Sequence, residues 1–179
     1  TDVPVVLDLM IHDIDLILSF VHSPVTDIKA SGVGIFTPTI DIANARIEFA
    51  NGAVANVTSS RVSLKQERIL RFFQRDAYMK MDFLTKQVQV IKKRANIQAV
   101  LYQILEGANN IKPEQLVDIQ NYDVSELGKD ALTLELESFI DCIKNNKKPI
   151  VDGEAGTRAL EIATMIINQI QTQNSKINL

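Results

Sequence analysis

Cysteine is nearly absent from this chain of 179 residues, and tryptophan is missing altogether. The single cysteine, Cys142, cannot form an internal disulfide, which fits a reducing compartment, and we expect a cytoplasmic protein. Disorder is excluded, because hydrophobic residues make up 46% of the sequence and a chain of this length can bury a sizeable core.

The sequence also has no excess of basic residues and no long apolar run. The net charge is −3 and the 19 lysine and arginine residues are scattered, whereas nucleic-acid binding needs a concentrated basic face. No apolar run reaches the roughly 18 residues of a membrane-spanning helix, because Asp and His interrupt the stretch from Val3 to Val21. The sequence therefore predicts neither nucleic acid nor a membrane as a partner.

The chain begins with neither methionine nor a signal peptide, and it opens directly on the apolar run TDVPVVLDLM. We interpret it as a piece of a longer protein. Its length predicts one domain over residues 1–179, and no internal repeat or low-complexity tract divides it.

Strand patterns follow an opening helix at about residues 4–21. Alternating runs on both sides of Asn51-Gly52 predict a hairpin, and further strands are expected near 68–72, 78–83, 87–92 and 115–122. Residues 98–114 are expected to be irregular, with Gly107 and Asn109-Asn110 as breakers. Two amphipathic helices, at about 130–145 and 154–173, close the chain. The last helix is expected to turn these residues inward: Ala159, Ile162, Ala163, Ile166, Ile167 and Ile170.

These elements predict an α+β fold class: a mainly antiparallel sheet of about six strands with helices packed on one face. The opposite face of such a sheet must be covered or solvated. Apolar residues lie on both sides of the pleat, which predicts a homodimer that pairs sheet to sheet. They are Phe49, Val54, Val57, Leu70, Phe72, Phe73, Met79 and Met81.

The opening helix carries charge in an otherwise apolar segment, DLMIHDIDLIL at residues 8–18. At about 100° per residue, five of its polar residues fall on one narrow line, while Asp13 lies elsewhere. We call this line the polar seam; its members are Asp8, His12, Asp15, Ser19 and His22. The rest of the surface is apolar, which predicts a buried helix whose polar seam lines a cleft or packs against polar partners.

Asp8 and His12 are four residues apart and should touch on one face of the helix. A carboxylate beside an imidazole orients it and suits it to acid–base catalysis near neutral pH. A purely structural Asp–His pair explains the same spacing about as well. Asp15 fits a structural role, such as pairing with an arginine of the sheet, and Ser19 and His22 fit solvent or cap positions.

Other chemistries fit the residues poorly. Asp8 and His12 could ligate a metal, and His12-Asp13 is similar to the doublet of metal-dependent phosphohydrolases. Those enzymes need further histidines on an all-helical fold, but this chain has two histidines and many strands. A nucleophilic serine is not indicated, because no Gly-x-Ser-x-Gly is present.

Three segments together resemble the C-terminal, substrate-binding half of the Gfo/Idh/MocA oxidoreductases, and MviM-type sugar dehydrogenases in particular. LDLMIHDIDLIL resembles the family's Asp-x-x-x-His-x-x-Asp helix, IEFANGAVANVTSSR its central hairpin, and LELESFIDCIKNNKKPIVDGEAGTRALEIATMI its closing helices. The resemblance implies a fold like the C-terminal domains of dihydrodipicolinate reductase and glyceraldehyde-3-phosphate dehydrogenase. It also implies that His12 is the acid–base for a hydroxyl of a sugar, nucleotide-sugar or cyclitol, and that Asp8 hydrogen-bonds the substrate or His12.

Two family elements are missing from the chain. It has no Gly-x-Gly-x-x-Gly fingerprint and no Glu-Lys-Pro motif with the family's catalytic lysine. We therefore expect NAD or NADP to bind the full-length enzyme and not this fragment, which should be inactive alone. Two other functions stay open: a non-catalytic, sheet-mediated binding or assembly module, and a metal-dependent hydrolase.

Overall fold

The computed structural model describes residues 3–94, 97–106, 112, 116–125 and 128–177. Its contacts divide the chain into two compact units, which are described separately. We call Thr1–Leu64 with Glu137–Leu179 the helix-covered unit, and Lys65–Leu136 the single-layer unit.

The helix-covered unit contains an antiparallel sheet of three strands in the order β1-β2-β3. The strands are β1 (Val25–Val33), β2 (Ile42–Phe49) and β3 (Val54–Ser60). Along β2 the side chains of Ala43, Ala45, Ile47 and Phe49 are buried, while the residues between them are more exposed. The period-2 pattern of the sequence thus predicts which face of the strand is covered.

The hairpin between β2 and β3 is confirmed, with a longer loop than Asn51-Gly52 alone. Phe49 N–H donates to the Ala53 carbonyl at 3.0 Å, and Gly52 N–H donates to the Phe49 carbonyl at 2.9 Å. Gly52 has φ +84°, as expected for the left-handed residue that follows a type I turn in a three-residue hairpin loop.

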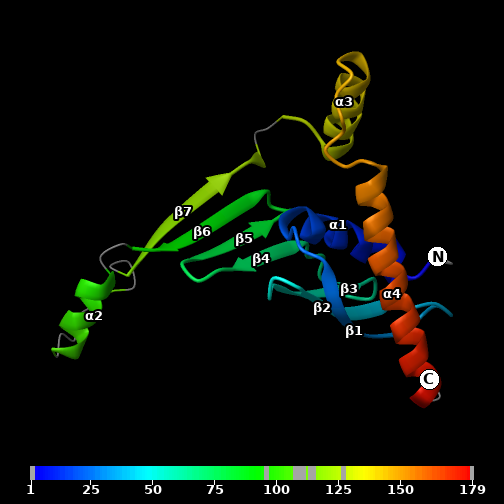
Figure 1. The fold of residues 1–179 in the computed structure, drawn as a ribbon, viewed down its shortest axis with the longest axis horizontal. Helices are drawn as coiled ribbons and strands as arrows, with labels where there is room; N and C mark the ends of the chain where they lie inside the picture. The colour runs from blue at the N-terminus through cyan, green and yellow to red at the C-terminus, as the bar shows by residue number, and fades with distance from the viewer. Residues whose placement is uncertain (1–2, 95–96, 107–111, 113–115, 126–127, 178–179) are drawn as a thin grey trace. The chain divides into compact units, whose positions relative to one another are not determined.

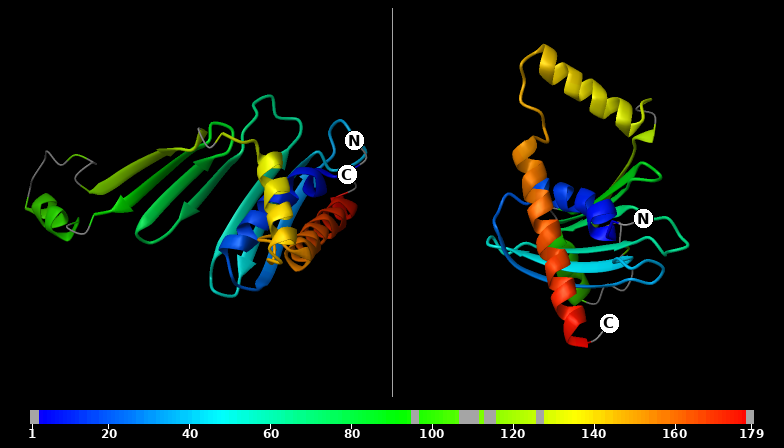
Figure 2. Two further views of the ribbon diagram at one scale, coloured as in Figure 1. Left: turned by 90° about the horizontal axis from the view of Figure 1, so that it is seen from above. Right: turned by 90° about the vertical axis from the view of Figure 1, so that its right-hand side faces the viewer.

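Helices cover one face of this sheet (Figures 1 and 2). The chain enters through a π-helical turn, η1 (Val6–Met10), continues as α1 (Ile11–Phe20), and returns as α4 (Gly153–Ile177). The predicted inward face of α4 is confirmed: five of its six residues are buried and Ile167 is partly buried against the same core. Those five are Ala159, Ile162, Ala163, Ile166 and Ile170.

The opening helix is buried on one side only, which corrects the prediction of a helix buried everywhere except along its polar seam. Val6, Met10, Ile14 and Ile17 pack in the core. Apolar Leu9 and Phe20 are exposed, at 42% and 49% of their surface. An apolar residue at the surface is common, so the sequence pattern overstated the burial.

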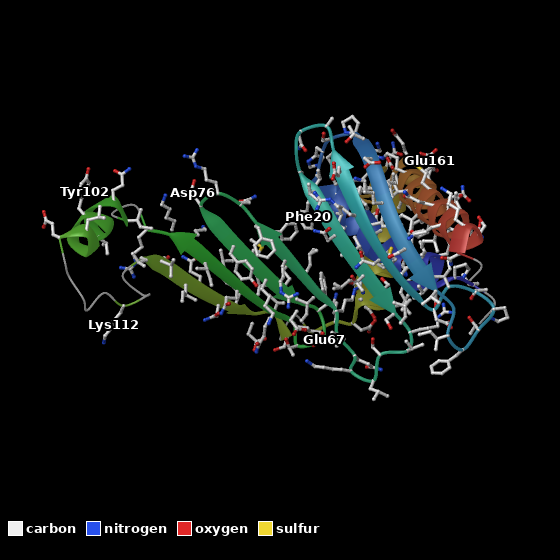
Figure 3. All side chains as sticks on the ribbon, turned by 90° about the horizontal axis from the view of Figure 1, so that it is seen from below. Phe20, Glu67, Asp76, Tyr102, Lys112 and Glu161 are labelled. Carbon is white, nitrogen blue, oxygen red and sulfur yellow. The ribbon has the colours of Figure 1, made fainter. Side chains whose placement is uncertain are left out.

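The single-layer unit contains an antiparallel sheet in the order β4-β5-β6-β7. Its strands, all predicted, are β4 (Ile69–Phe73), β5 (Ala77–Asp82), β6 (Gln87–Lys93) and β7 (Val117–Asp123). The helix α2 (Ile97–Leu105) lies beyond the ends of β6 and β7 (Figures 1 and 3), and its labelled Tyr102 projects away from the sheet. Part of the segment predicted to be irregular is therefore helical. Gly107 and Asn109-Asn110 lie outside the described residues.

The α+β class with mainly antiparallel pairing is confirmed, with seven strands in sheets of three and four. The predicted helix near 130–145 is α3 (Ala131–Lys144), and its described residues include none that is buried. Its apolar side chains recur at helical spacing on one face, which we call the α3 stripe. The stripe consists of Leu132, Leu136, Phe139, Ile140 and Ile143, each at least 48% exposed.

Candidate functional site

The candidate site begins at η1, where the chain makes a π-turn before the α-helix. Pro4 starts this segment, and its carbonyl accepts hydrogen bonds from the N–H groups of Leu7 and Asp8. Asp8 lies within η1 and His12 lies in the first turn of α1. Single π-turns inside helices occur often at functional sites, because they redirect side chains from the regular helical rows.

Asp8 does not pair with His12 as the spacing predicted. Among the described residues, no hydrogen bond or ion pair joins the two, and both side chains are exposed. The π-turn widens the helix between them, so the 100° spacing used for the polar seam does not hold there. The structure therefore leaves the His12 imidazole open to solvent and gives Asp8 a different partner.

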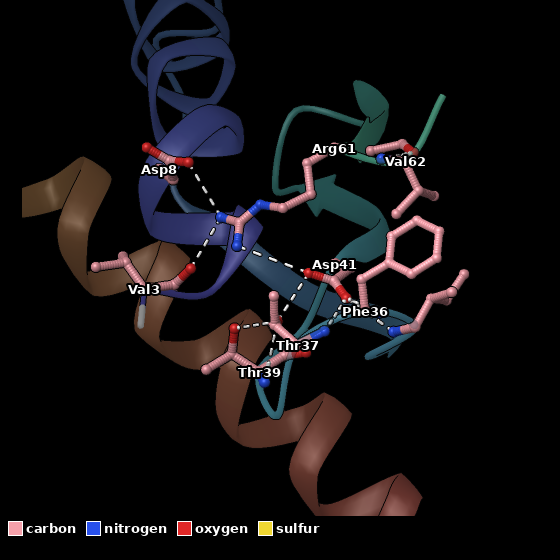
Figure 4. Close-up of polar contacts among 10 residues, drawn as sticks. Val3, Asp8, Phe36, Thr37, Thr39, Asp41, Arg61 and Val62 are labelled. Carbon is pink, nitrogen blue, oxygen red and sulfur yellow. Dashed lines mark hydrogen bonds and ion pairs between the residues drawn. The ribbon is translucent and has the colours of Figure 1, made fainter. Parts of the chain in front are cut away.

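That partner is Arg61, which follows strand β3. One guanidinium nitrogen, Nη2, donates to Asp8 Oδ2 at 3.0 Å and to the Val3 carbonyl at 2.8 Å (Figure 4). The sequence suggested an arginine from the sheet as one possible partner for Asp15, but among the described residues the arginine binds Asp8 and Asp15 has no ion pair. Asp8 keeps Oδ1 without a hydrogen bond among the described residues, and 47% of its side chain is exposed.

Behind Arg61 lies Asp41, a fully buried carboxylate that sequence reasoning missed. Its Oδ2 accepts hydrogen bonds of 2.7–2.9 Å from the backbone N–H groups of Ile35, Phe36 and Thr37. Its Oδ1 accepts another, of 2.8 Å, from the Thr37 hydroxyl. The signal in the sequence is modest: an Asp that follows the Thr-Pro-Thr turn and directly precedes a strand.

The charge of Asp41 is held by these contacts. Burial alone would raise the pKa of the carboxyl, but the hydrogen bonds from Ile35, Phe36 and Thr37 outweigh it and hold the pKa well below its ordinary value of 3.8. Arg61 Nη1 lies 3.7 Å from Asp41 Oδ1. Asp41 is therefore an anion at neutral pH, next to the guanidinium that binds Asp8.

The rest of the polar seam lies apart from this network. Asp15, Ser19 and His22 line an open groove of about 1210 Å³ between the end of α1, the start of β1 and α4. The Ser19 hydroxyl donates to the Leu16 carbonyl at 2.7 Å, which is a local helix contact. Neither Asp8 nor His12 lines the groove, so the five residues predicted to form one line belong to different surroundings.

Metal-ligating side chains do not cluster in the described part of the chain, and Gly32 and Gly34 are closely packed there. No group of three His, Cys, Asp or Glu side chains gathers among the described residues. In a separate respect, no helix of the described residues has the length and apolar character needed to cross a membrane. Gly32 and Gly34 leave no room for a phosphate: a Cβ at Gly32 would lie 2.8 Å from the Ile42 carbonyl oxygen and 3.0 Å from Ile170. These two glycines allow close packing, so the Gly32-Val33-Gly34 segment does not form a phosphate-binding loop.

Comparison with known proteins adds a family match and one clear relative. The model of the oxidoreductase family, C-terminal alpha/beta domain, matches residues 1–179. A UDP-N-acetylglucosamine 3-dehydrogenase from Acidithiobacillus ferrooxidans is 33% identical over 165 residues, which are 92% of this chain and 48% of the relative. The chain thus spans about half the length of the curated relative that it matches.

Solved structures share the fold. The structure of the Acidithiobacillus ferrooxidans dehydrogenase, GnnA, aligns with a TM-score of 0.79 and 31% identity, covering 96% of this chain and 50% of that one. A dehydrogenase (MviM) from Clostridium difficile gives a TM-score of 0.66 at 18% identity, with coverage of 94% and 50%. A levoglucosan dehydrogenase in complex with NADH gives 0.71 at 13% identity, with coverage of 92% and 47%.

Proposed function

Because this chain belongs to the Gfo/Idh/MocA oxidoreductase family, as its C-terminal alpha/beta domain, we propose that it is the substrate-binding and catalytic half of an NAD(P)-dependent dehydrogenase. The substrate is a sugar, nucleotide-sugar or cyclitol, which is oxidised at a hydroxyl group. The relative that is 33% identical over most of this chain is a UDP-N-acetylglucosamine 3-dehydrogenase, so a nucleotide-sugar is the first substrate to test.

One observation carries the catalytic assignment: Asp8 and His12 are exposed at the beginning of a helix whose other side is packed in the core. An exposed imidazole can take the proton that leaves a substrate hydroxyl on oxidation. The unoccupied Oδ1 of Asp8 can accept a hydrogen bond from the same substrate. The absence of a direct Asp8–His12 bond favours substrate contact as the role of Asp8.

We propose that the cofactor is held outside this chain. The Gly32-Val33-Gly34 segment does not form a phosphate-binding loop, and the chain spans about half of its relative. The α3 stripe is exposed in this chain, and an amphipathic helix is stabilised when its apolar face is buried. The exposed stripe therefore supports a further part of the full-length protein that packs against α3. Calorimetry with NAD(H) or NADP(H) tests whether the cofactor is held outside this chain, and tight binding to the isolated chain would contradict that proposal.

We propose a homo-oligomer formed through the sheet of the single-layer unit. The register places apolar side chains of four strands on one face: Leu70, Phe72, Met79, Met81, Val88, Val90 and Tyr122. Phe49 and Val57, which the sequence assigned to this contact, are instead buried in the core of the helix-covered unit. Light scattering of the full-length protein tests the proposal, and a monomer at all concentrations would contradict it.

We also propose a cytoplasmic location, which the single cysteine of the chain supports.

The decisive experiment is His12→Ala in the full-length protein, assayed by nicotinamide reduction with a nucleotide-sugar. Turnover should fall by about 10²- to 10⁴-fold, the usual contribution of a positioned acid–base group, while the melting temperature should not change. His22→Ala is the matched control, because it removes an exposed histidine near the end of the same helix. Equal turnover in the two variants would sink the catalytic assignment and favour a binding or assembly module.

A further inference from the structure

Arg61 joins two parts of the chain that are 53 residues apart. Its Nη2 bonds to the entry of the helical segment through the Val3 carbonyl and Asp8, and its Nη1 faces Asp41 (Figure 4). Only 17% of the side chain is exposed, compared with 47% for Asp8. The guanidinium therefore lies beneath the exposed carboxylate of the proposed site.

Asp41 and Arg61 are joined by a backbone hydrogen bond, and their charged groups lie close together. The backbone N–H of Arg61 donates to the Asp41 carbonyl at 3.0 Å, and the loop from Ile35 to Thr37 folds around the Asp41 carboxylate. Because this carboxylate is an anion held by the backbone, it has little freedom to rotate. The fold thus places the guanidinium beside a fixed anion, and its hydrogen bonds go to the Val3 carbonyl and to Asp8.

The arrangement is costly as a purely structural device. Nη1 is buried and has no hydrogen-bond partner among the described residues, since Asp41 is 3.7 Å away. Burying a guanidinium with incomplete partners costs free energy, and an apolar side chain of similar volume often replaces a buried ion pair without loss. An apolar side chain in place of Arg61 could not, however, donate a hydrogen bond to the Asp8 carboxylate.

We infer that Arg61 is a positioning residue for Asp8, anchored by Asp41. It binds Oδ2 and leaves Oδ1 directed to accept a hydroxyl of the substrate. The inference rests on the proposed function, in which Asp8 touches the substrate. A hydrogen bond to a charged group needs its acceptor in one orientation, and an exposed carboxylate on a helix would otherwise sample several rotamers.

The test is a double-mutant cycle of Arg61→Met and Asp8→Asn in the full-length enzyme. Arg61→Met should lower kcat/KM by about 10- to 100-fold, the range of a hydrogen bond to a charged group. In the Asp8→Asn background the same change should have almost no effect, because the group that Arg61 positions has lost its charge. Arg46→Met, which removes the exposed Arg46–Glu48 pair on β2, should leave kcat/KM unchanged.

Two outcomes separate the possible failures. If Arg61→Met lowers kcat/KM equally with and without Asp8→Asn, Arg61 acts by itself or on the fold, and the positioning role is wrong. If Asp8→Asn alone leaves kcat/KM unchanged, the proposed function of Asp8 fails first. Should Arg61→Met not fold, Arg61→Lys carries the same cycle, because its single ammonium cannot serve Asp41 and Asp8 together.

Discussion

The two units of this chain build antiparallel sheets from similar strands, but they bury very different amounts of apolar surface. Apart from Val90 and Val100, every buried hydrophobic side chain of the described residues lies in the helix-covered unit. There α1 and α4 pack on one face of β1–β3. In the single-layer unit, the helix α2 lies beyond the ends of β6 and β7 (Figure 1). A strand pattern thus forms a sheet in both units, but only the helices complete a core.

The largest expected effect comes from removing matched side chains in the two units. Ile166→Ala in α4 should lower the free energy of unfolding by about 2–5 kcal/mol, because Ile166 is fully buried. Ile91→Ala in β6 removes the same atoms from a half-buried position and should cost about 1 kcal/mol or less. Chemical denaturation of both variants checks this, and equal losses would refute the contrast between the units.

The next effect concerns how closely α4 approaches the sheet. Gly32→Ala should destabilise by about 1–3 kcal/mol, because its Cβ would meet Ile42 and Ile170. Gly156→Ala lies in α4 itself, where a Cβ meets nothing within 4 Å, and should stabilise by about 0.5–1 kcal/mol. A shift of the melting temperature in the same direction for both variants would contradict the close packing of α4 against the sheet at Gly32.

A smaller effect on stability is expected at acidic pH, where one hydrogen-bonded carboxylate in each unit becomes protonated. Hydrogen bonds from Thr85 and Leu84 lower the pKa of Asp82 in the single-layer unit, as those to Asp41 do in the other. A lowered folded-state pKa means stability that is present above the ordinary value of 3.8 and is lost as pH falls through the folded pKa.

Acid titration of unfolding therefore separates these carboxylates. Asp41→Asn should flatten the loss of stability below pH 3.8 more than Asp82→Asn does, because Asp41 is fully buried and Asp82 is only partly buried at the end of β5. An unchanged acid slope in Asp41→Asn would show that its hydrogen bonds do not favour the charged form.

The smallest effect is expected at Asp15. The sequence suggested a structural carboxylate whose loss would lower the melting temperature. Among the described residues it makes no hydrogen bond or ion pair, and it lines an open groove. Asp15→Asn should therefore change stability by no more than about 0.5 kcal/mol. A clear drop in melting temperature would mean that the helix-covered unit depends on its polar seam as well as on its core.

The local elements could be predicted from the amino-acid sequence alone. Alternation along β2 and the i, i+3, i+4 spacing of α4 follow from backbone geometry, so Ile47 and Ile166 could be placed in the core before any fold was known. Helix α2 could also have been found, since Ile97, Val100 and Ile104 recur at helical spacing, but the breakers at Gly107 and Asn109-Asn110 outweighed that pattern.

The contacts of the candidate site, in contrast, depend on how the chain folds. A helical row calculated from the sequence assumes regular turns, and the π-turn at Val6–Met10 breaks the assumed spacing between Asp8 and His12. The Asp8–Arg61 contact spans 53 residues, and it forms because β3 ends beside the entry of the opening helix. Strand and helix patterns depend on neighbours a few residues away, whereas an ion pair between distant segments depends on where the whole chain returns.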